Sequence, residues 1–167
     1  MTTDELDRIR RQFVEAGGHA TQSLGFGRLI GQIYLHAYFS PEPLTLDDLT
    51  RDLGISKGGA SMAVRQLEAW GALRRVWIKG DRMDYYEPLD DFGRIIRKAL
   101  LDLVGRRMED ADQLLADAEA RLQPARGART RAADAELLHE RLARLRAFRR
   151  KAQGLWESPV IQLLLKK

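Results

Sequence analysis

The stretch from Leu44 to Pro88 constrains the fold most, because it places two short helical patterns on either side of a tight turn. Thr45 is a typical helix N-cap, and the leucines after it recur at intervals of three and four, as on one helix face. Gly54 can adopt the positive φ that ends a helix, and Ser56 can cap the next one. This order predicts a helix, a turn and a second helix.

The second helix has two chemically different faces. Ala60, Val64 and Leu67 share one face, which is expected to pack against the first helix. A helix that enters a DNA major groove needs little bulk at its N-terminal end, with polar or guanidinium groups near base edges and phosphates. We therefore predict that DNA is contacted by the short, polar or basic residues of the other face: Ser56, Lys57, Gly58, Ser61, Met62, Arg65 and Gln66.

Two strand-like runs follow Gly71, which is expected to end the second helix. Ala72 to Lys79 alternates as a strand does, Gly80-Asp81 predicts a hairpin turn, and Arg82 to Glu87 is the returning strand. Helix, turn, helix and hairpin together predict a winged helix-turn-helix. The basic residues of the hairpin are predicted to bind DNA: Arg74, Arg75, Lys79 and Arg82.

Two helical patterns precede this stretch. Asp4 to Ala16 predicts an amphipathic helix that ends at Gly17-Gly18. Its apolar stripe needs cover, so we expect it to pack on a partner chain or on the C-terminal helices. The apolar segment from about Gln22 to Phe39 is expected to be the most buried helix of the winged-helix core, and Pro41 and Pro43 end it.

A long helical pattern follows the hairpin, from Asp90-Asp91 to Leu122, with heptad-like spacing of its apolar residues. At 1.5 Å per residue this helix is ~50 Å long and overshoots a small domain, so it needs a partner, most simply a second copy of the chain. The segment 124–130 is expected to turn the chain back into a helix over about 131–155, and a short helix is expected over 160–165.

The predicted fold class is therefore mainly α with a small β-hairpin. We divide the chain into an N-terminal helix that joins the dimer interface (1–21), a winged helix-turn-helix DNA-binding domain (22–89) and a helical dimerisation region (90–167).

Composition excludes several classes of protein. The hydrophobic fraction of 44% is that of a globular protein, and the absence of cysteine excludes disulfides and thiolate metal sites. No run of about 18 apolar residues occurs and the N-terminus is charged, so we expect a cytoplasmic protein without a membrane partner. The net charge of +4 permits a polyanionic partner.

No pattern of catalytic or metal-binding residues stands out. His19, His36 and His139 are scattered without the spacing of metal ligands, and no phosphate loop or Ser-His-Asp pattern is present. Gly25-Phe-Gly27 with Gly31 lacks the preceding strand of a nucleotide-binding loop, so helix packing is the simpler explanation. We expect no enzymatic activity, no metal and no cofactor.

Four pieces of the chain carry a family resemblance: the glycine-rich helix entry ISKGGAS, the helix end LEAWG, the hairpin RRVWIKGDR and the return strand DYYE. From about Leu24 to Leu103 the chain resembles the GbsR-type branch of the MarR-like winged-helix transcriptional regulators. The resemblance implies a homodimer held by its terminal helices, with recognition helices in successive major grooves and wings in flanking minor grooves. Many MarR-type wings separate an Asp and an Arg by one residue, and the acid orients the base. Asp81 and Arg82 are adjacent here, which departs from that pattern.

The resemblance also suggests a small effector, since the member that names the branch senses choline-like compounds, which aromatic cages bind through cation–π contacts. The candidate effector residues are Tyr34, Tyr38, Trp77 and Tyr86. Packing in the core and hairpin is the more common role of such rings. The basic segment Arg141 to Lys151 fits a solvated helix face, with contact to DNA beside the operator as the alternative hypothesis.

We predict a homodimeric transcriptional regulator, a repressor, that occludes a promoter at a pseudo-palindromic site with half-site centres ~34 Å apart. Effector binding would change that spacing. Two alternatives remain: an architectural DNA-binding protein without sequence preference, and a winged-helix module that binds other proteins.

Overall fold

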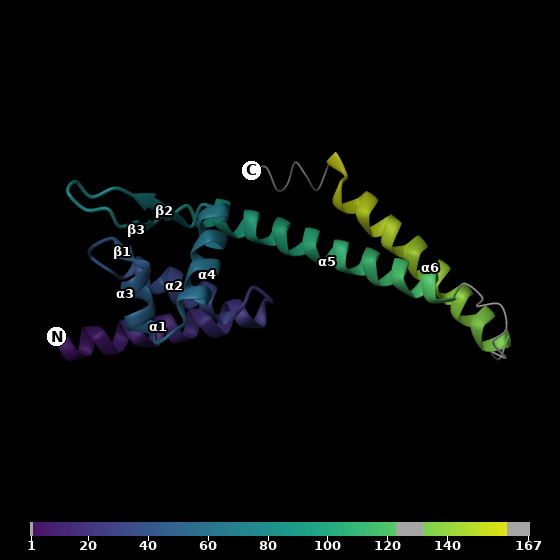
Figure 1. Cartoon of the computed structure of the whole chain (residues 1–167), viewed down its shortest axis with the longest axis horizontal. Helices are drawn as coiled ribbons and strands as arrows, with labels where there is room; N and C mark the ends of the chain where they lie inside the picture. The colour runs from purple at the N-terminus through teal and green to yellow at the C-terminus, as the bar shows by residue number, and fades with distance from the viewer. Residues whose placement is uncertain (1, 123–131, 160–167) are drawn as a thin grey trace. The chain divides into compact units, whose positions relative to one another are not determined.

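The computed structural model describes residues 2–122 and 132–159, and the chain divides into two compact units, Met1–Leu100 and Leu101–Lys167. The first unit contains α1 (Thr3–Ser23), α2 (Arg28–Tyr38), β1 (Leu44–Thr45), α3 (Leu46–Leu53), α4 (Lys57–Trp70), β2 (Leu73–Val76) and β3 (Tyr85–Pro88) (Figure 1). α5 (Phe92–Leu122) starts in the first unit and continues into the second, which also contains α6 (Ala132–Trp156). Within the described ranges, none of the helices is long and apolar enough to span a membrane.

The predicted helix-turn-helix is confirmed, with its caps at the predicted residues. The Thr45 hydroxyl accepts a hydrogen bond from the Asp48 amide at 3.1 Å, and the Asp48 carboxylate accepts one from the Thr45 amide at 3.0 Å. This capping box satisfies two amides that the first turn of α3 leaves unpaired, and it lowers the pKa of Asp48. Gly54 ends α3 with a φ of 63°, in the left-handed region that favours glycine.

The sheet has three strands in the order β1-β3-β2, all antiparallel. Leu44 pairs with Tyr86, and Leu73 pairs with Pro88. The prediction missed β1, because a strand of two residues shows no alternation and its partner lies far along the chain. The predicted hairpin strands were also too long, since β2 ends at Val76 and β3 begins at Tyr85.

The core of the first unit lies under α4. Ala60, Val64 and Leu67 are buried as predicted, together with Ile33 of α2 and Leu49 of α3. α5 adds Ile95 and Ala99 to the same core near its start, whereas Phe92 and Ile96 of the same helix are exposed. The sheet adds Leu73 and Tyr86.

The predicted end of the first helix at Gly17-Gly18 is wrong, because α1 runs through both glycines to Ser23. A methyl group on Gly31 of α2 would lie 2.0 Å from the Gly17 carbonyl oxygen, so the two backbones approach too closely for any larger residue. α1 thus packs on α2 within its own unit, while Leu6, Ile9 and Phe13 of its apolar stripe stay exposed, so cover of that stripe by a partner chain stays a prediction.

The predicted helix over 22–39 is shorter than expected. A turn separates α1 from α2, with Gly25 and Gly27 at positive φ, and α2 begins at Arg28. The Thr21 hydroxyl fixes this turn by donating to the Gly27 carbonyl oxygen at 2.8 Å.

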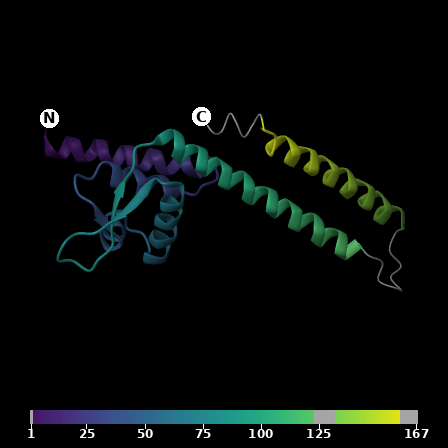
Figure 2. The ribbon, with the colours of Figure 1, turned by 90° about the horizontal axis from the view of Figure 1, so that it is seen from above.

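In the second unit, α6 runs back beside α5 (Figures 1 and 2). Arg149 of α6 ion-pairs with Asp112 of α5 and donates to the Met108 carbonyl oxygen at 3.3 Å. Leu115 and Leu142 are the buried leucines of the pair. The predicted turn at 124–130 and the predicted helix over 160–165 lie outside the described residues.

Replacement of Gly31 by alanine tests the close contact between α1 and α2. Gly31→Ala is expected to lower the free energy of unfolding by about 1–3 kcal/mol, because the added methyl group overpacks the contact. Urea denaturation followed by far-UV circular dichroism measures the change.

The matched control is Gly58→Ala, since a methyl group at Gly58 meets nothing within 4 Å. It should raise the free energy of unfolding slightly, by at most about 1 kcal/mol, because alanine loses less backbone entropy in a helix than glycine. Equal effects of the two substitutions would contradict the packing argument.

Candidate nucleic-acid interface

The residues predicted for the recognition face lie on the outer side of α4 and at its N-cap. Lys57, Gly58, Met62 and Arg65 are exposed, and the exposed fraction of Met62 is 71%. The structure therefore brings these side chains to one surface. DNA binding by them remains a prediction.

The remaining residues predicted for the recognition face are half-buried or cap the N-terminus of α4. Ser56 caps α4, and its hydroxyl accepts a hydrogen bond from the Gly59 amide at 3.2 Å. Ser61 and Gln66 are half-buried at the margin of the exposed face. A short side chain at the cap and a glycine two residues later, Gly58, leave the start of α4 open to a close partner.

Two basic side chains of α4 are held by neighbours. The Lys57 ammonium lies 2.9 Å from the Asp47 carboxylate of α3, and the Arg65 guanidinium donates to the Ser61 hydroxyl at 3.1 Å. Both contacts are exposed, and an exposed pair contributes at most about 1 kcal/mol. A stronger anionic partner such as a phosphate can therefore replace Asp47 at little cost.

The basic residues of the hairpin fall into two groups. At its base, Arg74 ion-pairs with Glu87, and Arg75 lies 3.1 Å from the Asp84 carboxylate. Near its tip, the side chains of Lys79 and Arg82 have neither an ion pair nor a hydrogen bond among the described residues. The strongest unneutralised positive charge of the wing is therefore at its tip.

Asp81 organises the hairpin turn. Its carboxylate accepts a hydrogen bond from the Tyr85 hydroxyl at 2.7 Å and one from the Met83 amide at 3.0 Å. The Tyr85 hydrogen bond is the main reason why the pKa of Asp81 is lowered, and it raises the pKa of Tyr85 in turn. Asp81 thus holds the turn through Tyr85, whereas in the pattern of many MarR-type wings the acid orients the arginine.

The four aromatic residues predicted for an effector do not form one cage, because Tyr34 and Tyr38 lie apart from Trp77 and Tyr86. Tyr86 is buried beneath the guanidinium of Arg75, which lies 5.6 Å from its ring centre. Trp77 lies on the wing, with an exposed fraction of 82%. Across the described chain, neither ring contacts Tyr34 or Tyr38.

Tyr34 and Tyr38 form a separate cluster with Phe92. The rings of Tyr34 and Tyr38 lie 6.0 Å apart, and each meets Phe92 edge-on at 6.2 Å and 5.7 Å. The Tyr34 hydroxyl donates to the Leu89 carbonyl oxygen at 2.8 Å, and burial raises the pKa of Tyr34 to about 12. Tyr34 therefore has a clear structural role in fixing the start of α5 to α2.

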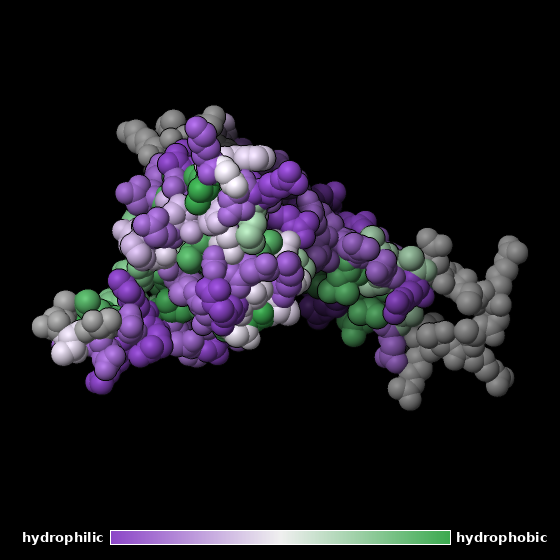
Figure 3. Space-filling view, turned by 60° about the vertical axis from the view of Figure 1, so that its left-hand side comes forward, coloured by the Kyte–Doolittle hydropathy of each residue, from purple (hydrophilic) through white to green (hydrophobic). Residues whose placement is uncertain are grey.

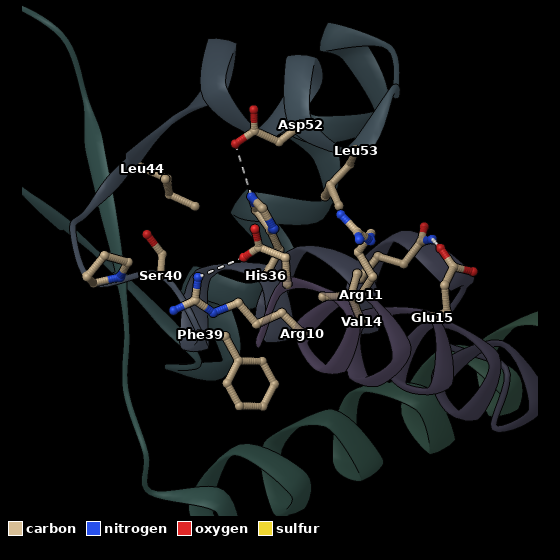
Figure 4. Close-up of a pocket in the computed structure, with 13 residues that line it drawn as sticks. Arg10, Arg11, Val14, Glu15, His36, Phe39, Ser40, Leu44, Asp52 and Leu53 are labelled. Atoms are coloured by element: carbon tan, nitrogen blue, oxygen red, sulfur yellow. Dashed lines mark hydrogen bonds and ion pairs between the residues drawn. The ribbon is translucent and has the colours of Figure 1, made fainter. Parts of the chain in front are cut away.

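A pocket of about 440 Å³ lies among α1, α2 and α3 in the first unit (Figure 4). Its wall combines apolar side chains, such as Val14 and Leu53, with charged ones. His36 is 3.2 Å from Asp52, whereas Arg11 has no ion pair or hydrogen bond within the described part of the chain and reaches towards Leu53. Sequence reasoning missed this pocket, because its residues come from three separate helices.

The basic segment Arg141 to Lys151 is partly neutralised. Arg146 lies 2.8 Å from Glu119 and Arg149 pairs with Asp112, so both side chains join α6 to α5. Arg150 is exposed and has no partner among the residues described. The described residues also contain no cluster of three or more side chains that could hold a metal ion.

The chain matches no protein-family model. It is 26% identical over 87 residues to YvaV of Bacillus subtilis, which is named as an HTH-type transcriptional regulator, and this match covers 52% of the chain and 49% of YvaV. It is 25% identical over 89 residues to the HTH-type transcriptional repressor OpcR of the same organism, which covers 53% of the chain and 48% of OpcR. The chain thus aligns with about half the length of these relatives.

One solved structure, a transcriptional regulator, aligns with 88% of the chain and 97% of its own length, with a TM-score of 0.50 and 23% identity. At this identity the likeness supports the fold alone. The chain is therefore a mainly helical protein with a winged helix-turn-helix, as the sequence predicted.

Proposed function

We propose that this chain is a transcriptional regulator, without enzymatic activity, that binds double-stranded DNA as a homodimer and acts as a repressor of the GbsR-type, MarR-like kind. The observation that carries the proposal is the division of α4, which buries Ala60, Val64 and Leu67 and exposes a small, polar and basic face. The names of the two Bacillus relatives agree with it. A role on DNA also favours the cytoplasm as its location.

In this proposal the exposed face of α4 enters the major groove. Gly58 and Ser61 let the helix approach the base edges, while Lys57 and Arg65 reach phosphates or guanines. The wing lies over the adjacent minor groove, where Lys79 and Arg82 meet the backbone. The Lys57–Asp47 pair opens when a phosphate replaces the carboxylate.

The test starts from a duplex that the protein itself selects from a random-sequence pool, with a scrambled duplex for comparison. The wild type should prefer the selected duplex by about a thousandfold or more. Lys57→Ala and Arg82→Ala should weaken binding, and each should reduce the slope of affinity against salt by about one phosphate contact. Fluorescence anisotropy at several salt concentrations measures both quantities.

Asp47→Asn is the matched control, because it removes a negative charge from the same surface and frees Lys57. It should strengthen DNA binding by up to about fivefold at low salt. Equal affinity for both duplexes would favour the architectural alternative, and absence of binding would favour the protein-interaction module.

The homodimer is supported by apolar surface that the single chain leaves uncovered. Figure 3 shows exposed hydrophobic side chains gathered on the second unit. On α6 they recur at heptad-like spacing: Leu138, Leu145, Phe148 and Leu155. Such a stripe is unfavourable in water and fits the same stripe of a second copy.

Replacement of Leu145 and Phe148 by glutamate should convert the dimer to a monomer in analytical ultracentrifugation, because the two charges would have to be buried at the interface. Met83→Glu, at an exposed apolar residue of the wing, should leave the dimer intact. A wild-type monomer would contradict the homodimer without bearing on the fold.

We further propose that a small effector modulates DNA binding and occupies the pocket among α1, α2 and α3. Its volume suits a small metabolite. Because the Arg11 guanidinium is unpaired within the described chain and reaches towards the apolar side chain of Leu53, we expect it to bind a small organic carboxylate.

Thermal unfolding with benzoate and with choline as probes separates this pocket from the tyrosine cluster. Benzoate should raise the Tm of the wild type and of Tyr38→Ala, but not that of Arg11→Ala. A rise in Tm with choline that is lost in Tyr38→Ala would instead support the aromatic residues as the effector site.

A further inference from the structure

The wing displays a tryptophan that the fold does not use. Trp77 has the largest exposed fraction among the large hydrophobic side chains of the described residues, 82%. Ile78 and Met83, which are also exposed, lie close to it in the sequence. Tryptophan ordinarily buries a large area, so one this exposed indicates a contact that the isolated chain does not make.

Trp77 does not hold the hairpin together. The turn is held by Asp81, which accepts hydrogen bonds from Tyr85 and Met83, and the base is held by the antiparallel pairing of β2 with β3. The hairpin projects away from the helices of its unit (Figures 1 and 2), and Trp77 makes no ring contact among the residues described. The ring is free to serve an external partner.

The charges around Trp77 identify the chemistry of that partner. Lys79 and Arg82 lie two and five residues away, and their side chains are unpaired in the described structure. A wing that offers both an exposed aromatic ring and two unneutralised cations matches a partner with anionic groups next to apolar ones. The minor groove of DNA provides both, since phosphates line its edges and sugars and bases form its walls and floor.

We propose that Trp77 is a DNA-contacting residue of the wing, whose indole inserts into the minor groove and packs against deoxyribose and base. This inference rests on the proposed DNA-binding function and adds to it a contact that is not ionic. The fixed turn of the wing keeps the ring exposed before DNA arrives.

The contact predicts a distinctive salt dependence. Trp77→Ala should weaken binding to the selected duplex by about five- to a hundredfold, by analogy with the loss of an aromatic ring that stacks on a base of a single strand. The slope of affinity against salt should stay unchanged, because no phosphate contact is lost, whereas Arg82→Ala should reduce it by about one. Leu24→Ala, at another exposed apolar residue outside the wing, is the matched control and should bind as the wild type does.

Fluorescence reports the same contact directly. The difference between the emission of the wild type and that of Trp77→Phe isolates Trp77 from Trp70 and Trp156. On addition of the selected duplex this difference signal should be quenched and become shielded from acrylamide, because the ring leaves water and meets a base.

Three outcomes would overturn the inference. If the wild type binds the duplex while Trp77→Ala binds equally well and the emission is unchanged, Trp77 is not a DNA contact and the proposed function stands. If Trp77→Ala alters the sedimentation of the free protein but not its DNA affinity, the ring serves contact with a second copy. If the wild type binds no duplex at all, the proposed function fails together with this inference.

Discussion

The winged helix depends on the burial of one side of α4 against α2 and α3. Ala60, Val64 and Leu67 are small or medium-sized, so the helix packs closely on Ile33 and Leu49, which are completely buried. A larger apolar surface on α4 would have to wrap around the helix and cover the side that now carries Lys57 and Arg65. The outer face stays polar because the inner face alone supplies the packing energy.

The basic residues of the proposed DNA surface fall into two groups, those that pair with a carboxylate and those that stay unpaired. Lys57, Arg74 and Arg75 each pair with a nearby carboxylate, which keeps their side chains in defined positions. Lys79 and Arg82, at the end of the hairpin, keep an unpaired charge among the residues described. The tip is therefore suited to attracting a polyanion such as DNA. Once the polyanion is close, the paired cations can exchange their carboxylate partners for its phosphates.

Local signals explain which parts of the fold could be predicted from the sequence. The limits of α3 and α4 follow from Thr45, Gly54, Ser56 and Gly71, whose effect is confined to one helical turn. The errors concern contacts between distant residues. The sequence predicts a helix end at Gly17, whereas its small size serves the close contact with Gly31 of α2. Likewise, β1 exists only through its pairing with β3.

The candidate DNA-binding face was predictable from the sequence to about the same degree as the fold. Helical periodicity correctly placed Lys57 and Arg65 on the exposed side of α4, because that side follows directly from which residues are apolar. The aromatic residues could not be grouped in this way, since Trp77 and Tyr86 lie in a hairpin whose register depends on tertiary structure. The pocket around Arg11 could not be predicted either, because its residues come together only when α1, α2 and α3 pack.

α5 connects the two roles that we propose for the chain. Its first turns place Ile95 and Ala99 in the core that seats α4, and later in the same helix Leu115 is buried in the second unit. The Tyr34 hydrogen bond to Leu89 secures the point where the chain enters α5. Because the helix is continuous, the second unit is joined to the core of the first unit without an intervening loop. In the proposed dimer, α5 is therefore the element that links the apolar stripe of the second unit to the core that seats α4.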